Sequence, residues 1–75
     1  SGGNSQMNNQ LIADAQTLIA QAQGMLGAMD SSGVQYQSIQ SAISSLQSVI
    51  SSSSPSQGDI VSAMGRLTQA MAGLY

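Results

Sequence analysis

Residues 36–50, with the sequence YQSIQSAISSLQSVI, decide the fold class, because their large apolar side chains recur at alternating steps of three and four. This spacing follows one face of an α-helix. It does not fit a strand, in which apolar side chains alternate every second position. The residues of this stripe are Tyr36, Ile39, Ile43, Leu46 and Ile50, with Ala42 and Val49 alongside.

The same spacing recurs on both sides of this segment, from Leu11 to Met29 and from Ile60 to Leu74. We therefore predict helices at 6–29, 33–51 and 57–74. The connections between them are short, so successive helices should run antiparallel in an all-α, up-down-up three-helix bundle. The predicted core consists of Leu11, Leu18, Ile19, Met25, Ile39, Ile43, Leu46, Ile50, Ile60, Met64, Leu67 and Met71. The methionines are interpreted as core filling, with a methionine-lined partner surface as the alternative.

Seventy-five residues form one domain at most. We assign residues 6–75 to the three-helix domain and interpret residues 1–5, SGGNS, as a flexible N-terminal linker or a cloning remnant. Gly24 and Gly27 are unusual inside a helical pattern, because each costs about 1 kcal/mol relative to Ala. They indicate either a frayed end of the first helix or a close approach by another helix.

Turn residues separate the three segments. The sequence Asp-Ser-Ser-Gly at 30–33 is typical of a turn, and Ser32 with Gln35 has the spacing of a capping box for the second helix. The Ser-rich run 51–56, which contains Pro55, forms the second break. Ser56 with Asp59 has capping-box spacing for the third helix, and the Asp carboxylate suits the positive N-terminal end of a helix.

Charge is scarce, since only Asp14, Asp30, Asp59 and Arg66 ionise near neutral pH. A single cationic side chain cannot neutralise a row of phosphates, so we expect no nucleic-acid partner. No apolar run is long enough for a membrane span. The chain has no His and no Cys, and its three carboxylates are far apart in sequence. We therefore expect no catalytic residues, no metal site, no cofactor and no enzymatic activity.

The composition instead favours association. Ser and Gln make up about a third of the chain, and the net charge is only −2. Little charge would have to be desolvated where two such surfaces meet. We predict a secreted structural module that binds itself, or one protein partner. The candidate association surface consists of the small residues Ala22, Gly24, Ala28, Ala63 and Ala70.

The second half of the chain resembles the C-terminal domains of spidroins, the silk proteins. The resemblance lies in the Ser-rich stretch 41–50, the Ser/Pro turn 51–56, Asp59-Ile60-Val61 and the apolar stretch 63–74. It implies a helical, dimer-forming domain that guides silk assembly. This chain departs from those domains in being shorter, in having fewer helices and in lacking the Cys that many of them carry.

Three alternatives stay open at this stage. A monomeric helical module could bind a different protein through an exposed apolar stripe. A subunit of a secreted bacterial filament, or a harpin-like protein, would share the Cys-free composition rich in Gln, Ser and Ala. An engineered bundle of low charge is the third.

Overall fold

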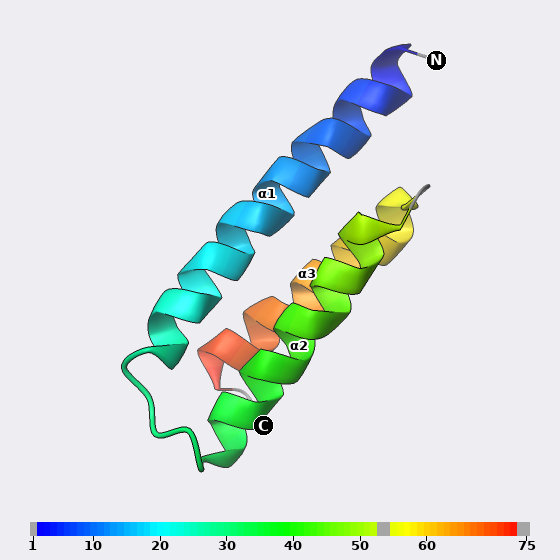
Figure 1. Cartoon of the computed structure of the whole chain (residues 1–75). Helices are drawn as coiled ribbons and strands as arrows, with labels where there is room; N and C mark the ends of the chain where they lie inside the picture. Colours follow the sequence, from blue (N-terminus) through cyan, green and yellow to red (C-terminus); the bar gives the residue numbers. More distant parts are fainter. Residues whose placement is uncertain (1, 53–54, 74–75) are drawn as a thin grey trace.

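The computed structural model describes residues 2–52 and 55–73, with side chains from residue 8 onward. Three helices account for most of this part of the chain: α1 (Gly2–Leu26), α2 (Val34–Ser51) and α3 (Gln57–Ala72). All three pack against one another. α2 runs antiparallel to α1 and α3, so the predicted all-α three-helix bundle is confirmed (Figure 1).

The bundle is a rod with extents of 45 × 19 × 19 Å. Its length comes from α1, which has 25 residues against 18 in α2 and 16 in α3. The N-terminal turns of α1 project beyond the connection between the other two helices (Figure 1). At about 1.5 Å per residue, the seven additional residues of α1 relative to α2 correspond to about 10 Å.

The core is a single apolar cluster along the axis of the rod. Its largest fully buried side chains are Ile39 and Leu46 from α2, with Ile60 and Leu67 from α3. All predicted core residues lie in this cluster or pack against it. Those that are only partly buried are Leu11, Leu18, Met25, Ile50, Met64 and Met71.

Alanines take a larger part in the core than the sequence pattern suggested. Ala15 and Ala22 of α1 are fully buried, and Ala63 and Ala70 of α3 are almost so. The centre of the buried face of α1 therefore follows Ala15, Ile19 and Ala22, and Leu18 lies at its edge. Small side chains at these positions let helix backbones approach closely while the larger residues interdigitate.

The boundaries of α1 differ from the predicted 6–29. α1 begins at Gly2, inside the segment interpreted as a linker, because a nucleated helix extends into a polar flank at little cost. It ends at Leu26, where the Ala28 and Met29 N–H groups donate to carbonyls only three residues back. A Cβ built on Gly24 would meet no atom within 4 Å, so the weakened helix end is supported over a close approach by another helix.

The N-terminus of α3 confirms one of the two predicted capping boxes in part. The Ser56 Oγ accepts the Asp59 N–H at 3.1 Å, and Asp59 lies in the first turn of the helix. At the other end, Gly73 adopts a left-handed φ of 70°, a conformation that favours glycine, and its N–H caps α3 carbonyls. The last residue of the predicted helix, Leu74, lies outside the described residues.

The capping box predicted for α2 at Ser32 and Gln35 is wrong. Gly33 is the N-cap, with extended angles (φ −75°, ψ 151°) and no side-chain cap bond. The Ser32 hydroxyl donates to the Asp30 carboxylate instead. The charged Asp30 carboxylate, two residues away, forms a stronger hydrogen bond with this hydroxyl than a backbone N–H group at the start of α2 would. The Gln35 side chain lies against Gly73, at the C-terminal end of α3.

Candidate association surfaces

The structure does not bring the predicted association residues together on one surface. Ala22, Ala63 and Ala70 are in the core, where their small size serves packing within this chain. Gly24 and Ala28 are exposed on α1 and just beyond it. The first three assignments are therefore corrected, because an alanine on an amphipathic helix fits the buried face as well as the exposed one.

Gly24 belongs to a different surface, which we call the outer line of α1. Ala13, Thr17, Ala20 and Gly24 are all exposed and are separated by steps of four, three and four. At 3.6 residues per turn they follow the side of α1 opposite the buried Ala15, Ile19 and Ala22. The Thr17 hydroxyl donates to the Ala13 carbonyl at 3.1 Å. The helix itself thus satisfies the one hydroxyl on this line.

The outer lines of the other two helices consist mostly of small residues. On α2 the exposed residues opposite the core are Gln37, Ser41, Ser44, Ser48 and Ser51, and on α3 they are Gly58, Ser62, Gly65, Gln69 and Ala72. Added Cβ atoms at Gly58 and Gly65 would meet nothing within 4 Å, so no contact inside the chain requires glycine there. Solvated helix faces usually present long charged side chains instead.

An outer line of small residues favours helix association in two ways. Gly and Ala lose almost no side-chain entropy when they are buried, whereas Lys, Glu and Gln lose the most. Side chains this short also let two helix axes come close, which increases dispersion contacts between backbones. The sequence carried the signal, since the outer line of α1 repeats the 4-3-4 spacing of the buried stripe on the opposite side of the helix. The spacing of the large apolar residues alone does not reveal this line.

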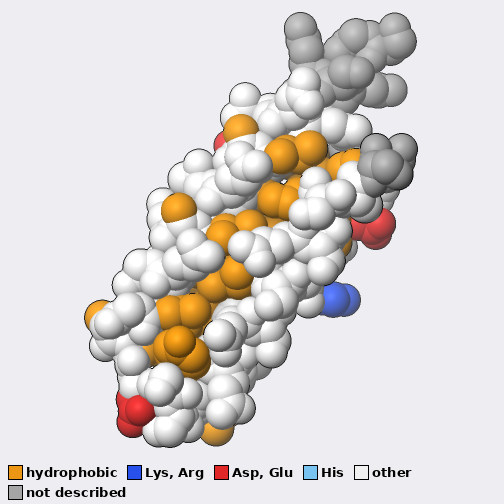
Figure 2. Space-filling model, viewed as in Figure 1, with side chains coloured by type: hydrophobic (Ala, Val, Ile, Leu, Met, Phe, Trp, Pro, Cys, Tyr) orange, Lys and Arg blue, Asp and Glu red, His pale blue; other side chains and the backbone are white. Residues whose placement is uncertain are grey.

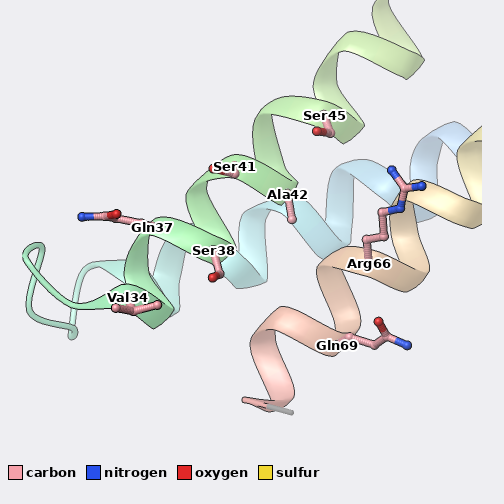
Figure 3. Close-up of a pocket in the computed structure, with 8 residues that line it drawn as sticks. All are labelled: Val34, Gln37, Ser38, Ser41, Ala42, Ser45, Arg66 and Gln69. Carbon is pink, nitrogen blue, oxygen red and sulfur yellow. The ribbon is translucent and has the colours of Figure 1, made fainter. Parts of the chain in front are cut away.

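A second surface is a shallow groove between α2 and α3, with a volume of about 560 Å³ (Figure 3). Arg66 and Gln69 line it from α3, and most of the side chains that line it from α2 are short. Val34 closes one end and is 81% exposed. The α2 lining consists of Val34, Gln37, Ser38, Ser41, Ala42 and Ser45.

A third feature is a band of apolar side chains along the seam between α1 and α2. Figure 2 shows this band running the length of the rod. It is the visible edge of the core, because partly buried residues on both helices pack against the core cluster from the outside. Their exposed parts give any second protein an apolar contact.

The charges are spread over the molecule rather than gathered at a site. Asp14 accepts a hydrogen bond from the Gln10 amide at 3.0 Å. Backbone and side-chain hydrogen bonds from Ser32 lower the pKa of Asp30, against a smaller opposing effect of desolvation. The described residues include no group of three or more His, Cys, Asp or Glu side chains that could hold a metal ion. None of the described helices combines the length and hydropathy needed to cross a bilayer.

Comparisons with known proteins add no relative to this description. No protein-family model, no curated protein and no solved structure matches the chain.

Proposed function

We propose that this chain is a non-enzymatic structural module that self-associates through the outer line of α1. The observation that carries the proposal is the sequence of that line: Ala13, Thr17, Ala20 and Gly24 occupy positions where a solvated helix normally presents long polar side chains. The line is less polar than the Ser-rich line of α2.

The electrostatics support the same function. With four charged side chains and a net charge of −2, two copies of the bundle repel each other weakly. A contact along α1 desolvates no charged side chain on the outer line itself. Such association depends little on ionic strength, because screening has few charges on which to act. This property suits an extracellular setting of variable salt, and with the composition it supports a secreted assembly protein of the silk type.

Sedimentation velocity over a wide range of concentrations tests the proposal. The expected result is a shift from monomer to dimer as concentration rises. Ala20→Glu, which places a long charged side chain on the outer line of α1, should keep the protein monomeric. Gln21→Glu is the matched control, because it adds the same charge beside the line and changes the size of the side chain very little. It should leave association unchanged.

Two outcomes would reject self-association through α1. One is wild-type protein that stays monomeric at the highest concentration. The other is an Ala20→Glu variant that dimerises as well as the wild type does while circular dichroism shows it to be folded. A monomeric wild type would favour the second candidate, a helical module that binds a different protein. The specific observation for that candidate is the groove between α2 and α3, where Ser38, Ser45 and Gln69 offer hydrogen-bonding groups.

A further inference from the structure

Four methionines carry the side chains of the described core that are most readily oxidised. Met25, Met29, Met64 and Met71 are partly buried and pack against the core cluster. The sequence contains no Cys, Trp or His, so thioethers are its most readily oxidised side chains. A partly buried thioether is open to a small oxidant and still contributes to packing. A change in its polarity therefore acts directly on the stability of the bundle.

Three of the four lie at the same end of the rod. Met25 is in the last turn of α1, Met29 is in the connection that follows it, and Met71 is in the last turn of α3. α1 and α3 run in the same direction, so both helices end at this end of the bundle (Figure 1). Met64 lies in the middle of α3, seven residues before Met71.

This end of the bundle also contains the C-terminal ends of two helices, α1 and α3. α1 finishes in a glycine-containing turn with hydrogen bonds to carbonyls three residues back, and it has no described side-chain cap there. Helix termini open at much lower free energy than central turns do. Opening exposes the sulfur atoms of Met25, Met29 and Met71 more often than that of Met64. The terminal methionines should therefore be the first to react.

We infer that Met25, Met29 and Met71 form an oxidation site at which a peroxide loosens the bundle. In the reaction with hydrogen peroxide, the thioether sulfur attacks one peroxide oxygen and the O–O bond breaks. The sulfur gains that oxygen and is oxidised by two electrons to a sulfoxide, and the other peroxide oxygen leaves as water. Each sulfoxide places a polar S=O group at the edge of an apolar core that contains no buried polar or charged residue among the described residues.

The experiment treats dilute protein with hydrogen peroxide under native conditions. Peptide mass spectrometry follows each methionine, and circular dichroism gives the melting temperature at each time point. We expect Met25, Met29 and Met71 to oxidise before Met64. The melting temperature should fall by at least about 5 °C once these three are sulfoxides, on the scale of about 4–8 °C per kcal/mol for a domain of this size. Methionine sulfoxide reductases for both sulfoxide epimers should restore it.

The matched control is the triple variant M25L/M29L/M71L, which keeps the volume and polarity of the three side chains and removes their sulfur atoms. Its melting temperature should not change during the same treatment, although Met7 and Met64 remain. The inference is overturned if this variant loses as much thermal stability as the wild type. Wild-type protein decides the matter without the variant, because three sulfoxides with an unchanged melting temperature would also overturn it.

Discussion

Ser32 donates two hydrogen bonds to the same carboxylate oxygen of Asp30, one from its backbone N–H at 3.0 Å and one from its hydroxyl at 2.9 Å. The Gly33 N–H donates to the Asp30 carbonyl at 3.0 Å, which closes the turn. This small network sets the path of the chain between α1 and α2. Both Ser32 bonds favour the ionised carboxylate and so lower the pKa of Asp30.

Stability should therefore depend on the ionisation of Asp30 in acid. A carboxyl group whose pKa is lower in the folded state stabilises the fold at pH values above its unfolded pKa of about 3.9. This contribution is lost as the pH falls through the lower folded value. Urea unfolding of wild type and of Asp30→Ala at several acidic pH values measures the difference. The two stability curves should converge as the pH falls, and a gap that stays constant would contradict the assignment.

Ser56→Ala should lower the free energy of unfolding by about 1 kcal/mol, because the Asp59 N–H loses the acceptor that caps α3. Chemical denaturation monitored by circular dichroism gives this value. Ser44→Ala is the control, since Ser44 is exposed in the middle of α2 and has no capping role. An equal loss in both variants would mean that the cap contributes nothing specific.

Core truncations should rank by burial. Leu46→Ala removes a fully buried side chain and should cost about 2–5 kcal/mol, enough to unfold much of a small domain. Leu18→Ala should cost less than Ile19→Ala, because Leu18 lies at the edge of the core and Ile19 is buried. Thermal melting of the three variants gives the order. A larger loss for Leu18 than for Ile19 would show that the buried face of α1 is rotated.

Gly65→Ala should stabilise the monomer by about 0.5–1 kcal/mol, because Ala is the better helix former and its Cβ meets nothing within 4 Å. Gly24→Ala should do the same in α1, with a smaller gain because it lies close to the end of that helix. Melting at low concentration measures both. If Gly24 also lies in a close contact between copies, Gly24→Ala weakens association in sedimentation while it strengthens the fold, which separates the two roles.

Large apolar residues made the helices and most of the core predictable. Steps of three and four place Ile39, Ile43 and Leu46 on one face of a helix, whatever the neighbouring helices do. The same steps left a choice between Leu18 and Ile19 as the centre of α1. Adjacent residues on a wide stripe differ by only about 100° around the helix, and contact with other helices determines which one is buried.

Small and polar residues were harder to place. Ala22, Ala63 and Ala70 fit a surface or a core equally well, and only the packed bundle shows that they are inside. Ser32 matched a capping pattern, but the pattern did not weigh the competing acceptor on Asp30. The outer lines were also hard to recognise from the sequence, because their distinguishing feature is a lack of long side chains. The spacing of hydrophobic residues gives no information about such a lack.

An odd number of antiparallel helices has a mechanical consequence for this rod. The first turn of α1 and the last turn of α3 lie at opposite ends of the long axis (Figure 1). Tension applied across these two points would load the helices lengthwise. It would tend to slide α1 along its neighbours, so that many side chains resist together, rather than peel one helix away turn by turn. Held in this way, the bundle would resist extension through shear between its helices.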